Sequence, residues 1–264
     1  MASLTRKVTF ASQGLDRRSI NGALRGARNN TMLSLIGNPR GTYDQECRMP
    51  TNPVVSDLVV YSADVGPFKV TGLKPAVETL ETILSDVQRN ERTVYDALGH
   101  VGMLCCRYVR GSTTTISNHS WGTAIDLTIN GVLDTRGDGK TQTGLLKIYE
   151  YFNNHGFFWG AAFRTEDCMH FEASDQLIQK WHSDGRLGDG GVLANNGFLD
   201  LGDRGPEVTE LQERLNLILS LDLDVDGIFG PATRAAVMEF QRRENLAVDG
   251  VVSPRTKSAL GLRE

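Results

Sequence analysis

The chain has 264 residues, of which 40% are hydrophobic and 23% are charged, and its formal net charge is −4. It is long enough for one full domain and a small second one. No stretch approaches the run of about 18 apolar residues that a transmembrane helix needs, so we expect no membrane insertion. Residues 198–264 carry 8 basic and 12 acidic side chains and the rest is balanced, which excludes a basic surface for nucleic acid.

Residues 1–30 are rich in Arg and Asn, and we expect them to form an arm or an extra helix. The first ten residues carry positive charge with no apolar core behind it, unlike a secretory signal peptide. We therefore expect synthesis in the cytoplasm.

Four cysteines occur without any C-x-x-C pair, which argues against a structural zinc knuckle. Free, mostly buried thiols are the default for a protein of this size made in the cytoplasm. We expect this state for Cys47, Cys105, Cys106 and Cys168.

Residues 31–182 show the periodicities of one mixed domain. Apolar residues recur at helical spacing over residues 75–88, 143–155 and 174–182, and Gly156 ends the second helix. Strand-like runs occupy residues 101–109, 123–129 and 156–160. Helices combined with a short antiparallel sheet predict an α+β fold.

Residues 183–198 contain five glycines and few apolar side chains, which is typical of a flexible linker. Residues 199–264 then form a tail that is small but within the size range in which domains fold alone. The tail contains a repeat in which Asp226-Gly227 and Asp249-Gly250 are 23 residues apart, each followed by a Pro and a helical pattern. We predict a three-helix bundle.

Two histidines and one aspartate are candidate metal ligands. Asp126 lies in an apolar strand, where a carboxylate is costly unless it is paired or binds a metal. His119 precedes it by seven residues and His170 follows in a second segment. Two His, one carboxylate and an open fourth position make a catalytic zinc site. The alternative is that Asp126 faces outward and His119 is an ordinary surface residue.

Asp167 is the candidate general base because it lies three residues before His170. Its neighbour Glu166 would point the other way in an extended segment. Arg107 is the candidate that stabilises an oxyanion, and Arg110 is the second choice.

These residues fall into recognisable motifs: Ser117-x-His119-x-x-Gly122-x-Ala124-x-Asp126, Gly156-Phe157-x-Trp159-Gly160, and Asp167-x-Met169-His170-Phe171. Over about residues 40–182 they resemble the zinc D-alanyl-D-alanine carboxypeptidase / L-alanyl-D-glutamate endopeptidase family of peptidoglycan peptidases. The resemblance implies that His119, Asp126 and His170 bind one zinc ion, with Asp167 as base and Arg107 at the transition state. Ser117 and Trp159 are the expected substrate contacts. Many members have Glu at the base position, and the Asp resembles the phage-lysin branch.

The tail resembles a three-helix peptidoglycan-binding domain. The signature of such domains, Asp-Gly-x-x-Gly-Pro-x-Thr, occurs in the first copy of the repeat. In the second copy, Ser253 replaces the glycine that precedes the proline. The resemblance implies wall binding through Asp226, Gly227, Gly230 and Thr233.

Together these features predict a monomeric zinc peptidase whose partner is bacterial peptidoglycan. We expect a phage endolysin that reaches the cell wall at lysis. One alternative is a D-Ala-D-Ala carboxypeptidase. The other is a non-catalytic wall-binding phage structural protein.

Overall fold

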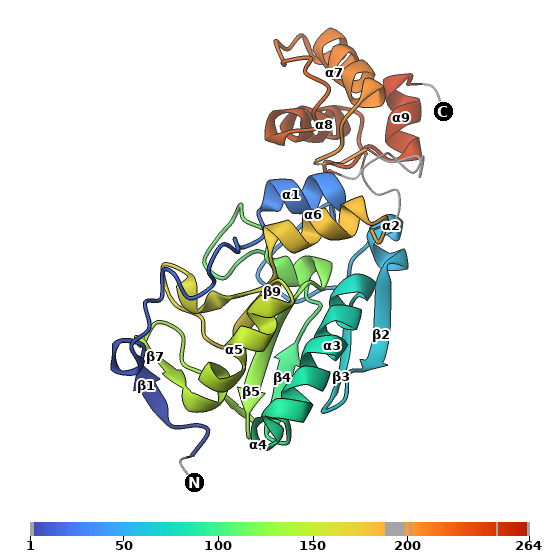
Figure 1. Ribbon diagram of the computed structural model, residues 1–264. Helices are drawn as coiled ribbons and strands as arrows, with labels where there is room; N and C mark the ends of the chain where they lie inside the picture. The colour runs from blue at the N-terminus through green and yellow to red at the C-terminus, as the bar shows by residue number, and fades with distance from the viewer. Residues whose placement is uncertain (1–2, 188–198, 201, 247, 263–264) are drawn as a thin grey trace.

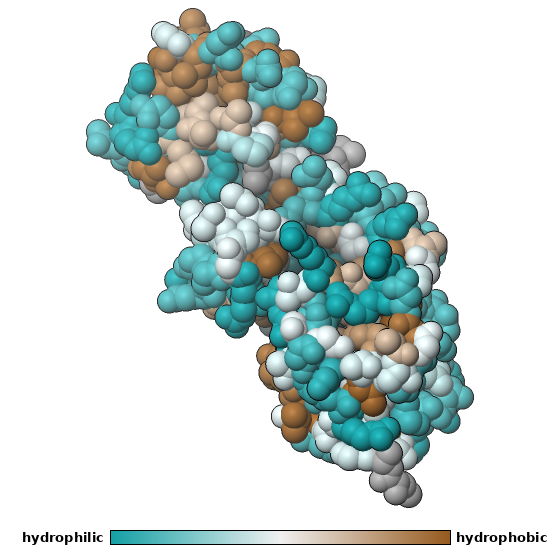
Figure 2. Space-filling view, turned by 90° about the vertical axis from the view of Figure 1, so that its left-hand side faces the viewer, coloured by the Kyte–Doolittle hydropathy of each residue, from teal (hydrophilic) through white to brown (hydrophobic). Residues whose placement is uncertain are grey.

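A computed structural model describes residues 3–187, 199–200, 202–246 and 248–262. Buried side chains form two separate hydrophobic clusters, one reaching from Phe10 to Leu187 and one from Leu199 to Leu260. Two bodies are visible, the smaller one built from the C-terminal helices (Figure 1, Figure 2). Within the described ranges, no helix is long and apolar enough to cross a membrane.

The larger body is built on an antiparallel sheet, so the α+β prediction is confirmed. Its strand order is β4-β5-β9-β8, and short β6 pairs with β5. The bounds are β4 Leu98–Gly102, β5 Ala124–Ile129, β6 Val132–Leu133, β8 Phe157–Trp159 and β9 His170–Ala173. Asp126 pairs in register with His170 across β5 and β9, which brings two candidate ligands side by side.

The three helices expected in this body are present. They are α3 (Lys74–Asn90), α5 (Thr143–Asn154) and α6 (Asp175–Ser183). Gly156 ends α5 as expected, because its φ of +84° is one that side chains with a Cβ rarely adopt. Helices α3 and α5 lie against each other across one face of the sheet, and α6 lies next to α1 (Asn29–Leu35) (Figure 1).

The strand expected over residues 101–109 is wrong beyond Gly102, where β4 ends. The backbone after that point is bonded to several separate segments instead of one strand. Cys106 forms an isolated antiparallel β-bridge with Arg48, and Tyr108 forms another with Ile116. The Cys105 N–H donates to the carbonyl of His119. The elements without a strong sequence signal are α2 (Pro53–Asp57), β2 (Val59–Asp64), β3 (Lys69–Leu73), α4 (Arg92–Tyr95) and β7 (Lys140–Gln142).

The N-terminal residues that the structure describes pack onto this body. Strand β1 (Lys7–Thr9) pairs with β7, and Phe10 is buried against Trp159. Farther along, the buried side chain of Asn21 accepts from the Trp159 N–H and donates to its carbonyl. Gly26 forms a bridge with Ser174. The segment is therefore part of the larger body's packing.

The expectation of free thiols is wrong for Cys47 and Cys105, which form a disulfide with a Cα–Cα distance of 4.9 Å. The bond joins segments that the Arg48–Cys106 bridge already holds together. A separation of 58 residues left no pairing signal in the sequence. The expectation holds for Cys106 and Cys168, which are free and buried.

The tail contains the three expected helices, α7 (Pro206–Leu219), α8 (Pro231–Arg243) and α9 (Pro254–Leu260), each beginning at a proline. The predicted linker continues past Leu187 into residues 188–198, which lie outside the described residues.

Each turn of the repeat is held by a buried glutamine. Gln212 accepts from the Gly227 N–H and contacts the Asp226 carboxylate, while Gln241 does the same for Gly250 and Asp249.

Candidate metal centre

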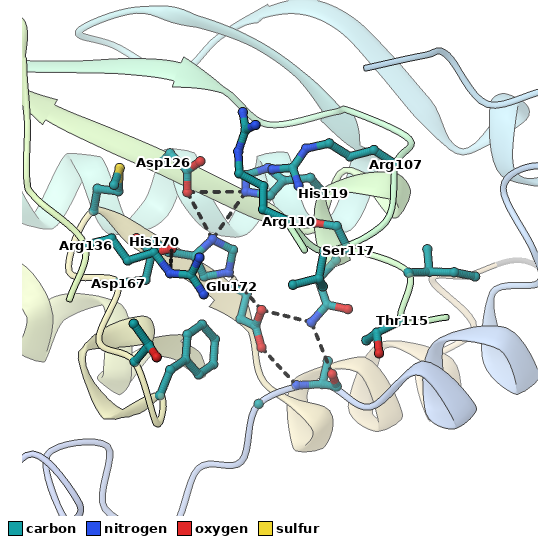
Figure 3. Close-up of a pocket in the computed structure, with 18 of the residues that line it drawn as sticks. Arg107, Arg110, Thr115, Ser117, His119, Asp126, Arg136, Asp167, His170 and Glu172 are labelled. Atoms are coloured by element: carbon teal, nitrogen blue, oxygen red, sulfur yellow. Dashed lines mark hydrogen bonds and ion pairs between the residues drawn. The ribbon is translucent and has the colours of Figure 1, made fainter. Parts of the chain in front are cut away.

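Three buried or partly buried side chains bring their ligand atoms together in the larger body (Figure 3). His119 Nε2 lies 3.2 Å from His170 Nδ1 and 3.3 Å from Asp126 Oδ1. His170 Nδ1 lies 3.0 Å from the same Asp126 oxygen. The two segments that were expected to share a site therefore meet.

Two paired strands and a short helix bring these three ligand side chains together. Asp126 and His170 come from paired strands, whereas His119 lies on the short 3-10 helix η2 (Asn118–Trp121). Gly122 ends η2 with a φ of +66°. A Cβ at Gly122 would lie 2.8 Å from the backbone of Gly72 and Leu73, so only glycine fits this close approach.

The donor set fits a zinc ion. Ligand atoms about 2.0–2.1 Å from a tetrahedral zinc lie roughly 3.3 Å from one another, close to the three observed separations. One carboxylate and two imidazoles are also common zinc ligands. The set supplies three protein ligands, all lining the cleft, and catalytic zinc sites likewise have three protein ligands and an open fourth position.

Electrostatics within the cluster are strong. Burial alone would raise the pKa of Asp126, but hydrogen bonds from His119 and His170 hold it far below its usual range. Burial would lower the pKa of His170, but its hydrogen bonds to Asp126 and Glu172 raise it to about 10. The two carboxylates on either side of His170 therefore favour its protonated form.

Asp167 lines the same cleft as the three candidate ligands. Burial raises the pKa of its carboxyl group, and the Asp126 charge adds to the effect, while His170 and Arg136 oppose it. Among the described residues, its buried Oδ1 has no hydrogen-bond partner. Glu166 instead contacts Arg17 and the Gly139 N–H, so the two acidic neighbours have different surroundings.

Arg107 and Arg110 both line the cleft on the His119 side (Figure 3). Arg107 is half-buried, and desolvation followed by the charge of Arg110 lowers its pKa. The nearby charges of Asp126 and Asp167 raise it. Arg110 is exposed. Arg107 therefore interacts electrostatically with both Asp126 and Asp167 and is less exposed than Arg110.

The two expected substrate contacts differ in position. Ser117 lines the cleft, and its backbone N–H donates to the Arg107 carbonyl. Trp159 is 0% exposed, stacks on Tyr149 and Phe171, and is not among the cleft residues. Its indole N–H donates to the Cys168 carbonyl, so the structure supports a packing role for Trp159.

The four expected wall-binding residues lie together in the first turn of the tail. Thr233 is buried and contacts Gln212, while Asp226 accepts from Gln212 and from the Ile228 N–H. Gly227 has a φ of +68°, and Gly230 directly precedes α8. These contacts show what holds the turn together, and wall binding through it stays a prediction.

Sequence reasoning missed three features of the cleft, which has a volume of about 980 Å³. Glu172 lies two residues after His170 and therefore on the same face of β9, a spacing that could have revealed it. Arg136 comes from the loop before β7 and carried no signal. Residues 26–29 also line the cleft, although they are far from the motifs in sequence.

Comparison with known proteins confirms the resemblance drawn from the motifs. Residues 110–173 match the family model described as D-alanyl-D-alanine carboxypeptidase. Residues 204–260 match the model described as a putative peptidoglycan binding domain. The first match contains all three candidate ligands and Asp167, and the second contains both turns of the repeat.

Individual relatives also match only about a quarter of this chain. An uncharacterized protein of Kitasatospora aureofaciens is 42% identical over 72 residues, which are 27% of this chain and 61% of that protein. The zinc D-Ala-D-Ala carboxypeptidase of Streptomyces albus G is 43% identical over 68 residues, 25% of this chain and 27% of that enzyme. The crystal structure of a Burkholderia AP3 phage endolysin is 46% identical over 25% of this chain and 26% of that chain, with a TM-score of 0.23. The chain thus spans less than two thirds of each relative.

Proposed function

We propose that this chain, which joins a segment of the D-alanyl-D-alanine carboxypeptidase family to a peptidoglycan-binding domain, is a zinc-dependent peptidase of peptidoglycan stem peptides. The observation that carries the proposal is the convergence of His119, Asp126 and His170 beside the carboxylate of Asp167. The matches of both parts of the chain to families named for the cell wall support this substrate.

In this proposal His119, Asp126 and His170 hold one zinc ion. Zinc in such a site supplies Lewis-acid polarisation of a carbonyl group and makes a water molecule more acidic. Both imidazoles are buried and Asp126 is partly buried, which strengthens their electrostatic interactions.

Asp167 is the proposed general base, because its carboxylate lines the cleft and one of its oxygens is free of protein donors among the described residues. It would take a proton from the attacking water and return it to the leaving amine. Arg107 would stabilise the negative charge that develops on the scissile carbonyl oxygen. Ser117 would contact the peptide from the same wall of the cleft.

The finer proposal is a phage endolysin with L-alanyl-D-glutamate endopeptidase activity. Its support is the aspartate at the position of the base, which resembles the lysin branch of the family. Such a protein would be made in the host cytoplasm and act on the wall after release at lysis, where the tail would hold it on peptidoglycan.

The test is digestion of purified murein by the zinc-loaded full chain, with Asp167→Ala as the comparison. An endopeptidase creates new internal amino groups and releases no free alanine. Release of free D-alanine would instead establish the carboxypeptidase alternative. Binding to murein without any released product, and with equal behaviour of both proteins, would contradict the proposal and favour a non-catalytic wall-binding protein.

A further inference from the structure

Glu172 is a buried carboxylate at the metal centre that the proposed chemistry does not use. It is 4% exposed and lies on β9, two residues after His170. Its Oε2 is 2.9 Å from Nε2 of His170, the ring nitrogen that faces away from Asp126 and His119. A buried carboxylate is costly unless donors satisfy it, so the position needs a reason.

The two nitrogens of His170 have different partners. Nδ1 faces Asp126 and His119, whereas Nε2 faces Glu172 (Figure 3). An ionised carboxylate only accepts hydrogen bonds, so Nε2 must carry a proton to bond with Glu172. When Nε2 keeps that proton, the lone pair available for a metal is the one on Nδ1.

His119 is also oriented by an acceptor on the side away from the centre, but its outer nitrogen is Nδ1 and its inner nitrogen is Nε2. Its Nδ1 lies 3.1 Å from the carbonyl oxygen of Met103, which can only accept, so its Nε2 is left to face the cluster. The two histidines therefore present opposite nitrogens to the centre, and each has an acceptor behind its outer nitrogen.

Glu172 is itself held by donors from two other segments. Its Oε2 accepts from the Asn118 side-chain amide at 2.9 Å, and its Oε1 accepts from the Ala27 N–H at 3.2 Å. Asn118 also donates to the Ala27 carbonyl. A Cβ on Gly26 would lie 2.9 Å from Oε1, so the backbone approaches the carboxylate as closely as glycine permits. Residues 26 and 27 lie outside the matched segment 110–173.

We propose that Glu172 is a positioning residue that fixes the tautomer of His170, so that Nδ1 binds the metal, and that the segment at Gly26 and Ala27 holds Glu172 in place. The inference rests on the zinc site of the proposed function. Glu172 acts through His170 and does not contact the reacting atoms.

The first experiment is long-range ¹H–¹⁵N NMR of the histidine rings in the zinc-loaded full chain. The expected spectrum has His170 coordinated through Nδ1 with a proton on Nε2, and His119 coordinated through Nε2. This readout needs no variant, so it decides the point even if substitutions prevent folding. Coordination of His170 through Nε2 would overturn the proposal.

The second experiment is zinc affinity, measured by competition with a chromophoric chelator. Glu172→Gln keeps the shape of the side chain but weakens the acceptor, and we expect a loss of about 10- to 100-fold in affinity. Glu166→Gln is the matched control, because Glu166 is equally buried and lies outside the cleft residues. It should bind zinc like the wild type.

The outcomes separate this inference from the proposed function. Zinc binding by Glu172→Gln with wild-type affinity would overturn the role of Glu172 and leave the proposed peptidase intact. A wild-type chain that binds no zinc would overturn both. A spectrum with Nδ1 coordination, together with selective loss of affinity in Glu172→Gln, would support the inference.

Discussion

The Nε of Arg136 lies 3.5 Å from Oδ2 of Asp167, while within the described ranges the buried Oδ1 of the same carboxylate has no hydrogen-bond partner. The ion pair is partly exposed, since the Arg136 side chain is 43% accessible. One side of the carboxylate is therefore held by a positive charge, and the other is left for a group inside the cleft. This asymmetry suits a residue that must be charged, oriented and still able to accept a proton.

Asp167→Asn should abolish most of the activity and leave the metal centre loaded. Asparagine keeps the size of the side chain but cannot take a proton, and general-base catalysis contributes about 10²- to 10⁴-fold. The measurement is murein hydrolysis beside zinc content per chain. A variant that keeps one zinc and loses this activity supports the base assignment, whereas a variant that hydrolyses murein at the wild-type rate rules it out.

Arg136→Gln should move the acidic limb of the pH–rate profile to higher pH. The Arg136 charge lowers the pKa of Asp167, so its removal raises that pKa further above the ordinary value. A general base works only when deprotonated, and a higher pKa therefore requires a higher pH for the same activity. The check is kcat/KM across pH 4 to 8, with Arg18→Gln as control, because Arg18 is exposed and lies outside the cleft residues. An unchanged or acid-shifted limb would contradict the role of the ion pair.

Arg107→Ala should reduce kcat far more than Arg110→Ala. Arg107 is half-buried near Asp126 and Asp167, and removal of one oxyanion donor costs about 10²- to 10³-fold. Arg110 is exposed, and its loss should act mainly on KM. Steady-state kinetics of both variants on one soluble stem peptide distinguishes them. The assignment fails if Arg110→Ala shows the larger loss in kcat.

The centre could be predicted from sequence where its residues stand in an unfavourable local context. Asp126 in an apolar strand is one such residue. His170 was predicted differently, from its spacing three residues after Asp167. Glu172 carried the same signal, because its burial follows from the period of the strand. Arg136 could not be found, because it reaches the cleft from an irregular loop.

The fold likewise has elements that the sequence pattern predicts and features that it does not. Helices α3, α5 and α6 follow the apolar periodicity closely. The hairpin β2–β3 and the Cys47–Cys105 disulfide depend on tertiary pairing, which sequence spacing does not reveal.

Zinc affinity should rise with pH because binding displaces a proton. In the metal-free protein, hydrogen bonds to Asp126 and Glu172 raise the pKa of His170 to about 10, so near neutral pH the ring is charged. Zinc at Nδ1 must replace one proton. At pH values below that pKa, the apparent zinc affinity should therefore rise about tenfold for each unit by which the pH is increased. Calorimetry in two buffers of different ionisation enthalpy counts the released protons. A pH-independent affinity would show that His170 binds the metal without losing a proton.

Gln212→Ala should destabilise the tail, because this 1% exposed side chain satisfies the turn of the first repeat copy. Its Oε1 accepts from the Gly227 N–H, and its Nε2 contacts the Asp226 carboxylate and the Thr233 hydroxyl. Leaving buried polar groups unpaired costs about 1–3 kcal/mol of unfolding free energy. Glu213→Ala, on the exposed face of the same helix, should stay within about 0.5 kcal/mol of the wild type. Urea unfolding of both variants gives the comparison, and equal stabilities would mean that the glutamine does not hold the turn.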